Sequence, residues 1–242
     1  MPSPLTGYWS FDSSRLFLNH GSFGACPDFV IEEQRKWQNL MEKEPVRFFE
    51  ELMPDLLLKS REALGTFLSC SPNDLAFVSN ATSGVNTILR SLHFEQGDEI
   101  LVPNHAYQAC RNSIDFVAQR SGATVVVVSI PFPIDGPQTV IDVMKSARTE
   151  RTKLVMIDTV TSPTGLRMPF EELTSFFEDQ GVEVLLDAAH GIGMIPLDLE
   201  TLGASYVTSN CHKWLCAPKG TAFLYVREDK QNKIQPLTIS HG

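Results

Sequence analysis

Short apolar runs rich in β-branched residues recur along the chain after its first quarter, and they predict strands. The runs lie at 75–78, 99–102, 124–130, 153–157, 182–186, 206–208 and 221–226. Stretches with a helical hydrophobic period separate the earlier runs, at 84–92, 107–120, 138–149 and 170–180. Several runs, such as TVVVVSI and KLVMID, are apolar on both faces, which is typical of parallel strands covered by helices on both sides.

This alternation predicts an α/β fold with three layers, α/β/α, around a mostly parallel but mixed seven-stranded sheet. Only a loop separates the last two runs, so we expect them to form an antiparallel pair at one edge of the sheet.

The first quarter of the chain has a different pattern. Residues 1–28 are rich in Pro, Gly, Ser and Asn and predict an extended N-terminal arm. A helical pattern follows to residue 67, and Pro45 and Pro54 divide it into about three pieces. No linker divides the rest, so we expect one large domain at 29–242. The last residues resemble the start of another element, and we expect a small C-terminal domain to be absent.

Composition and charge limit the functions open to the chain. It has 242 residues and 20 basic against 29 acidic side chains, a net charge of −9, which argues against binding nucleic acid. Its five cysteines form no CxxC pair, so we expect reduced thiols and no metal site. The N-terminus lacks a signal-peptide pattern, and no apolar run is long enough to cross a membrane. We therefore predict a cytoplasmic protein without a membrane partner.

Polar residues follow five of the predicted strands, and in an open α/β sheet ligands bind at the carboxyl ends of strands. The segments after these strands contain small and hydroxyl residues at 79–84, rings at 103–107, a polar turn at 158–165, Asp187, and Lys213. Taken singly, each has an ordinary explanation: a helix cap, a packing ring, a turn, a capping acid and a surface lysine. Together they match what pyridoxal phosphate requires, namely a phosphate site, a stacking ring, an acid for the ring nitrogen and a lysine for the Schiff base. No Gly-rich dinucleotide or Walker motif competes with this interpretation.

Five segments carry a resemblance to a known family. They are FLNHGSFGACP, SNATSGVNTIL, DTVTSPTGLRMP, LLDAAHGIG and SNCHKWLCAPKGTAFLYV. They resemble the class V aminotransferase superfamily of fold type I pyridoxal-phosphate enzymes, and within it the branch of isopenicillin N epimerase-like enzymes and C–S lyases. The similarity extends from about residue 16 to the C-terminus.

The resemblance implies roles for individual residues. Lys213 resembles the lysine that forms the Schiff base and moves the proton at the substrate α-carbon. Asp187 resembles the partner of the ring nitrogen, and His190 would contact the phenolic oxygen of the cofactor or support Asp187. Tyr107 is the expected stacking ring, and an ungapped match would give His105 instead. The other implied cofactor contacts are Ala81, Thr82, Ser83, Thr161, Ser162, Asn210 and His212. Asn19 and His20 match an arm that borders the substrate pocket.

The family resemblance also implies an amino-acid substrate and, for the full-length protein, a homodimer. Epimerisation, loss of a β-sulfur group and amino transfer share the same early chemistry, and the residues present do not choose among them. A cysteine desulfurase-like transferase and a truncated, non-catalytic cofactor-binding protein are the alternatives. Family members usually bind the substrate carboxylate with an arginine of the small domain, and here Arg47 and Arg167 are the candidates to replace it.

Overall fold

Seven strands form one sheet in the computed structural model, which describes residues 3–240. The strands are β1 (Leu75–Val78), β2 (Glu99–Pro103), β3 (Thr124–Val128), β4 (Thr152–Asp158), β5 (Glu183–Asp187), β6 (Tyr206–Asn210) and β7 (Ala222–Val226). Their order across the sheet is β1-β7-β6-β5-β4-β2-β3. The α/β fold and the mixed seven-stranded sheet predicted from the sequence are confirmed, and each strand lies within two residues of its predicted place.

The antiparallel strand is not at the edge. β7 pairs antiparallel with β6, as expected, but it also pairs antiparallel with β1 on its other side. The outer strand is therefore β1, and the prediction of an edge pair was wrong in this respect. The reason is that β1 takes the backbone hydrogen-bonding groups on the free side of β7, from Leu75 opposite Tyr225 to Val78 opposite Ala222.

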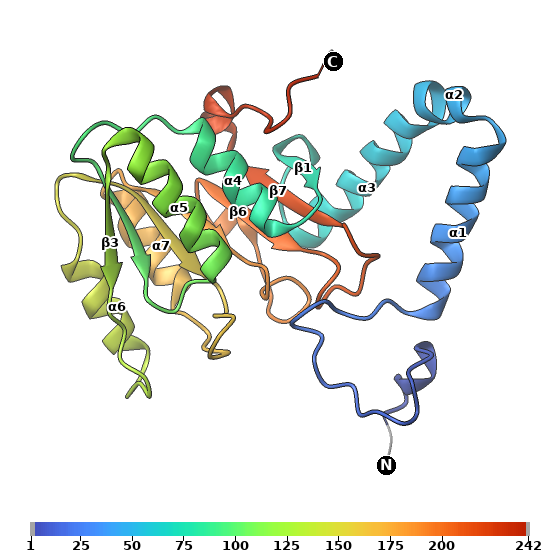
Figure 1. Cartoon of the computed structure of the whole chain (residues 1–242), viewed down its shortest axis with the longest axis horizontal. Helices are drawn as coiled ribbons and strands as arrows, with labels where there is room; N and C mark the ends of the chain where they lie inside the picture. The colour runs from blue at the N-terminus through green and yellow to red at the C-terminus, as the bar shows by residue number, and fades with distance from the viewer. Residues whose placement is uncertain (1–2, 241–242) are drawn as a thin grey trace.

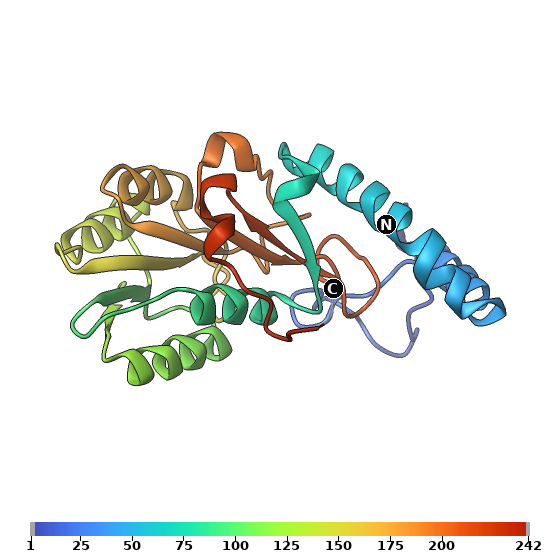
Figure 2. The same cartoon turned by 90° about the horizontal axis from the view of Figure 1, so that it is seen from above.

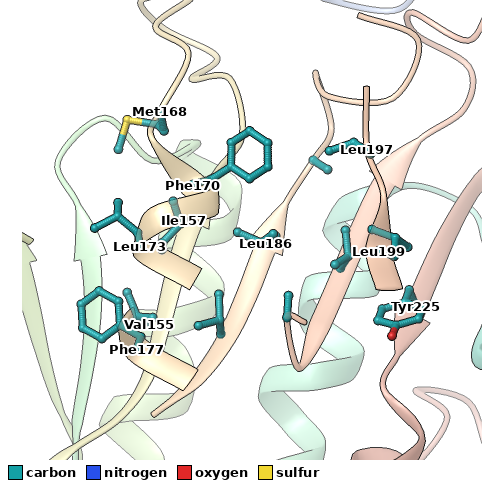
Figure 3. Close-up of a cluster of buried hydrophobic side chains, with 14 of the residues drawn as sticks. Val155, Ile157, Met168, Phe170, Leu173, Phe177, Leu186, Leu197, Leu199 and Tyr225 are labelled. Carbon is teal, nitrogen blue, oxygen red and sulfur yellow. The ribbon is translucent and has the colours of Figure 1, made fainter. Parts of the chain in front are cut away.

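Helices cover both faces of the sheet (Figures 1 and 2). One face carries α4 (Ala81–Ser91) and α5 (Gln108–Ser121); the other carries α6 (Pro137–Ser146) and α7 (Phe170–Asp179), with the short α8 (Leu199–Leu202). Alternate residues of each strand face opposite layers, so Val155 and Ile157 pack in one core while Leu154 and Met156 pack in the other. Figure 3 shows part of the first core, where α7 contributes Phe170, Leu173 and Phe177.

The helices before the sheet project away from it (Figure 1). They are α1 (Asp28–Lys43), α2 (Pro45–Arg47), a π-helical turn at Phe48–Leu52 and α3 (Met53–Leu68). Pro45 and Pro54 lie in first turns, where proline costs no hydrogen bond, so the predicted division into pieces is confirmed. No residue of α1 is buried, and α3 is buried only near its end.

Short 3-10 turns complete the described chain, at Thr6–Tyr8, Pro72–Asp74 and Glu228–Lys233. Among residues 3–240, the helices are too short or too polar for any of them to cross a bilayer.

Candidate active site

A small cavity lies where the carboxyl ends of β4, β5 and β6 meet the first turn of α4. Its volume is about 20 Å³, which is room for about one water molecule. Ten residues line it: Ala81, Thr82, Tyr107, Asp158, Ser162, Asp187, Ala189, His190, Asn210 and Lys213. Eight of these were predicted as site residues from the sequence, and Asp158 and Ala189 were not.

The start of α4 is arranged as an anion site. Asn80 caps the helix, because its Oδ1 accepts a hydrogen bond from the Ser83 amide at 2.8 Å. Asn210, at the end of β6, accepts a hydrogen bond from the Ala81 amide at 2.9 Å and so ties the helix to the sheet. Thr82 lines the cavity, and its amide belongs to the first turn of α4, where backbone N–H groups have no partner within the helix. A helix N-terminus with free donors favours a phosphate.

Lys213, His190 and Trp214 form a hydrogen-bonded chain beside this helix. The Trp214 indole donates from Nε1 to His190 Nδ1 at 3.1 Å, and His190 Nε2 lies 3.2 Å from Lys213 Nζ. An indole can only donate, so Nδ1 is the acceptor and a neutral imidazole carries its proton on Nε2. That proton points at Nζ, and this arrangement suits a lysine in its neutral amine form.

Burial lowers the pKa values of both Lys213 and His190, which favours the neutral forms that this geometry requires. It lowers the pKa of the Lys213 amine below its ordinary value, with the carboxylate of Asp187 opposing part of the shift. Burial, reinforced by the charge of Lys213, lowers the pKa of His190 to about 4. A half-buried lysine with a lowered pKa can act as a nucleophile near neutral pH.

Two buried carboxyl groups stand at the ends of adjacent strands. Asp187 and Asp158 are direct register partners on β5 and β4, and their exposed fractions are 3% and 2%. Asp187 accepts hydrogen bonds from the Ala189 amide at 3.0 Å and from the Cys110 thiol at 3.2 Å. Burial raises the pKa of both carboxyls, and for Asp158 the neighbouring Asp187 raises it further. Neither forms a salt bridge within residues 3–240, so the site lacks a cation that contacts them.

The structure separates the two candidates for the stacking ring. Tyr107 immediately precedes α5, lines the cavity and is 44% exposed. His105 is buried outside the cavity lining, and its ring nitrogens lie 3.1 Å from Thr164 Oγ1 and 3.2 Å from the Ile130 carbonyl oxygen. The geometry therefore favours Tyr107.

Three further predicted residues lie near the cavity without lining it. Thr161 closes its own loop, since its hydroxyl accepts from the Leu166 amide at 2.9 Å. Ser83 turns toward Ser79, with 3.0 Å between the hydroxyl oxygens. His212 points back to the Thr221 carbonyl, 3.0 Å from its Nδ1. These three are held by the protein itself, as His105 is, whereas Ser162 faces the cavity.

The N-terminal arm packs on the lysine loop. Gly24 is buried with φ +70°, and a Cβ there would lie 2.0 Å from the His212 carbonyl oxygen. The ring of His20 lies 5.9 Å from that of Trp214. Asn19 holds a local turn with Ser22 rather than contacting the cavity. The arm thus borders the site from outside, and a Cβ at Gly21 would lie 3.3 Å from both His190 Cε1 and Trp214 Cζ2.

Neither arginine proposed for a substrate carboxylate reaches the cavity. Arg47 lies in α2, far from the sheet (Figure 1), and forms an ion pair with Glu51 at 3.3 Å. Arg167 is paired with Glu171 and stacks over Phe170. The described residues also contain no group of His, Cys, Asp and Glu side chains suited to a metal ion.

Comparison with known proteins agrees with this geometry. The family profile described as "Aminotransferase class-V" matches residues 28–242. The chain belongs to the class V aminotransferase family. The resemblance drawn from the sequence motifs is therefore confirmed, and the residues gathered at the cavity lie within the matched part of this family member.

Curated relatives include both branches expected from the sequence. The chain is 34% identical to a protein of Arabidopsis thaliana named "Probable L-cysteine desulfhydrase, chloroplastic", over 91% of this chain and 50% of the relative. It is 33% identical to the isopenicillin N epimerase of Amycolatopsis lactamdurans, over 96% of this chain and 59% of the relative. The chain thus spans about half the length of the curated relatives that it matches.

Solved structures show the same fold. The cystine C–S lyase C-DES, in complex with its product cysteine persulfide, superposes with a TM-score of 0.83 at 24% identity, over 93% of this chain and 60% of that one. Another C-DES structure, with glycine covalently linked to its pyridoxal-phosphate cofactor, has a TM-score of 0.84 at 23% identity, over 94% and 60%.

Proposed function

We propose that this chain is the cofactor-binding part of a pyridoxal-phosphate enzyme that acts on the α-carbon of an amino acid. The observation that carries the proposal is the position of Lys213. Its amine, with a pKa lowered by burial, lies 3.2 Å from His190 and in the same small cavity as Asp187 and the first turn of α4. Membership of the class V aminotransferase family, whose enzymes use this cofactor, supports the same conclusion.

The residues present fit the chemistry of the cofactor. Within residues 3–240, the buried carboxyls of Asp158 and Asp187 form no salt bridge, and the Asp158 Oδ2 atom has no hydrogen-bond partner. A protonated ring nitrogen would supply the missing cation to Asp187. Thr82, in the first turn of α4, would hold the phosphate. Because the cavity has room for about one water, the Lys213 and Tyr107 side chains must move aside when the ring enters.

When bound, pyridoxal phosphate makes the α-proton of an amino acid acidic by accepting the charge left on carbon. The chain then needs a base at that carbon, and Lys213 as a neutral amine can take the proton and return it as an ammonium group. His190, through Nε2–H, orients the amine, and Trp214 keeps His190 in that tautomer. Asp187 stabilises positive charge at the ring nitrogen, and Tyr107 would cover one face of the ring.

Cysteine desulfhydrases and isopenicillin N epimerases are both among the relatives, so the proposal extends to the step that they share, which is removal of the α-proton. Loss of a β-sulfur group or reprotonation on carbon would follow. A desulfurase-like transferase is the second candidate, since the cysteine desulfurase CsdA of Escherichia coli shares the fold at 20% identity and a TM-score of 0.80, over 93% of this chain and 57% of that one. A homodimer and a cytoplasmic location remain part of the proposal.

The test is to titrate the purified chain with pyridoxal phosphate and reduce it with borohydride. We expect a visible absorbance band and a cofactor-modified peptide that contains Lys213. Lys219 is the matched control, because it is exposed on the same loop. Lys213→Ala should abolish the band and the label, whereas Lys219→Ala should retain both. Label on any other lysine of the wild-type chain would refute the assignment.

Catalysis is tested separately, by exchange of the α-hydrogen of L-cysteine and other amino acids in D₂O. Exchange by the wild-type chain and none by Lys213→Ala would support the shared step. Cofactor binding without exchange, in a form extended to the length of the relatives, would favour the non-catalytic alternative.

A further inference from the structure

We propose that Asp158 is a positioning residue of this site, where it holds a proton on its free oxygen so that the negative charge of the carboxyl pair lies on Asp187. The inference deepens the proposed function and rests on it for the identity of the ligand. It rests on the structure alone for the state of the two carboxyls.

The first observation is the placement of the pair. β4 and β5 run parallel, and the register puts Asp158 directly beside Asp187 at the carboxyl ends of both strands. Both side chains line the cavity and both are almost completely buried. The Asp158 Oδ2 atom makes no hydrogen bond, although it is buried. An orphaned carboxyl oxygen facing a ligand cavity requires an explanation, because burial of an unpaired polar atom costs free energy.

The second observation is the set of groups that surround the pair. From α5 comes the Cys110 thiol, which donates to Asp187 at 3.2 Å, and the backbone dipole of Tyr107, just before α5, favours the charged form of Asp158. The loop after β5 contributes the Ala189 amide to Asp187. Beyond these, the titratable groups that line the cavity are His190, which burial keeps neutral, Lys213 and the Tyr107 phenol. The Lys213 amine lies 3.2 Å from His190 Nε2 and forms no salt bridge with either carboxyl within residues 3–240.

These contacts decide which carboxyl ionises. Two neighbouring carboxylates in a dry site do not both carry charge, and one proton is retained by the pair. Asp187 has two hydrogen-bond donors, the Cys110 thiol and the Ala189 amide, and both favour its charged form. The Oδ2 atom of Asp158 has no hydrogen-bond partner within residues 3–240, and the charge of the neighbouring Asp187 opposes the ionisation of Asp158. The proton therefore belongs to Asp158, on its unpartnered Oδ2 atom.

The function follows from this assignment. When Asp158 is neutral, Asp187 carries the single negative charge of the pair, which matches the single positive charge of a protonated ring nitrogen. An ionised Asp158 would add a second, uncompensated charge and would draw Lys213 toward its ammonium form.

Asparagine imitates a protonated carboxyl, because it is neutral, has nearly the same shape and carries a donor group in place of Oδ2–H beside an acceptor oxygen. Alanine has neither the donor nor the acceptor. Asp158→Asn should therefore retain cofactor affinity within about threefold, which is well under 1 kcal/mol. Asp158→Ala should weaken cofactor binding at least tenfold. Asp187→Asn is the matched control on the neighbouring strand, and it should impair cofactor binding although the chemical change is the same.

A second readout uses the chain without cofactor. A carboxyl whose folded-state pKa is raised stabilises the fold below its unfolded pKa of about 3.9, and this contribution is lost as the pH rises toward the folded pKa. Between about pH 4 and neutrality, the unfolding constant of the wild type should therefore rise relative to Asp158→Asn, by up to about tenfold per pH unit. A purely structural role would not change this slope. The infrared difference between the two proteins at neutral pH should contain the C=O stretch of a protonated carboxyl.

Parallel pH profiles for wild type and Asp158→Asn, or an Asn variant as impaired as the Ala variant, would overturn the inference. The stability profile needs no cofactor, so it can support the inference even if Lys213 is not labelled. Conversely, Lys213 can be labelled while the profiles are parallel. The two proposals therefore fail independently.

Discussion

Gly24 offers the sharpest test of how the N-terminal arm meets the lysine loop. The residue is buried with φ +70°, a conformation that side chains other than glycine rarely adopt. A Cβ at this position would lie 2.0 Å from the His212 carbonyl oxygen and 2.9 Å from the Lys213 Cα atom. Both neighbours are backbone, so a side-chain rotation cannot relieve the overlap. Gly24→Ala should force the arm away from the loop.

The magnitude has two parts. Placing Ala in the left-handed region costs about 1–2 kcal/mol wherever it occurs. Overpacking against the backbone adds about 1–3 kcal/mol. Gly181 separates these parts, because it has φ +73° but no atom lies within 4 Å of the place that its Cβ would take. The free-energy cost of Gly24→Ala minus that of Gly181→Ala should therefore reflect the overlap alone, about 1–3 kcal/mol. This corresponds to a change of about 5- to 150-fold in the equilibrium constant for docking of the arm.

The assay is hydrogen–deuterium exchange of the arm, followed by mass spectrometry. The Ala25 amide donates to His20 Nδ1 at 3.3 Å in the docked arm, so its protection reports docking. Gly24→Ala should accelerate exchange in the peptide around Ala25 by the factor above, while Gly181→Ala leaves that peptide unchanged. If both variants exchange in this peptide as the wild type does, the arm does not pack on the lysine loop as described.

Two further predictions concern the surroundings of Lys213 and the exposed helices. Trp214→Phe removes the donor to His190 Nδ1, which should lower the free energy of unfolding by about 1 kcal/mol. Without this donor, His190 is no longer confined to the tautomer with its proton on Nε2, which is the tautomer that suits a neutral Lys213 amine. The pKa of Lys213 should rise as a result, and competitive acetylation of lysines across pH would detect it; an unchanged Lys213 profile would contradict the tautomer argument. Trp37 and Phe49 are 41% and 47% exposed on the projecting helices, so we expect the chain to self-associate. Sedimentation should show a dimer or larger species that Trp37→Ser with Phe49→Ser weakens, and a wild-type monomer at micromolar concentration would refute this.

Much of the sheet could be predicted from the sequence because its inner strands are buried on both faces, whereas the outer β1 and β3 are partly exposed. Strands buried on both faces appear as continuous apolar runs, and their ends carry the polar residues of the site. The order of the strands is not visible in the runs. The position of β1 outside β7, and therefore the identity of the edge, depends on long-range pairing that a single sequence does not encode locally.

The same limit explains the missed residue. Asp158 ends an apolar strand just as Asp187 does, and this signal was available in the sequence. It was interpreted as part of a polar turn, because only the register of β4 against β5 brings the two carboxyls together. His105 and Thr161, which the sequence also predicts as cofactor contacts, do not line the cavity. Their polar atoms are satisfied by the protein, through Ile130 and Leu166, and sequence spacing does not reveal such partners.

The electrostatics of the cavity connect the fold to the chemistry. The strands deliver two carboxyls and one amine to a space that holds about one water, and such a space does not stabilise several unpaired charges. The lysine is driven toward its neutral amine, and one carboxyl toward its acid form, by the same burial that stabilises the sheet. A ligand with a cationic ring nitrogen would supply the partner that Asp187 lacks at the strand ends. In the proposed mechanism, the base is therefore held as a neutral amine before any ligand arrives, and the protein's own contacts already assign the negative charge of the carboxyl pair to Asp187.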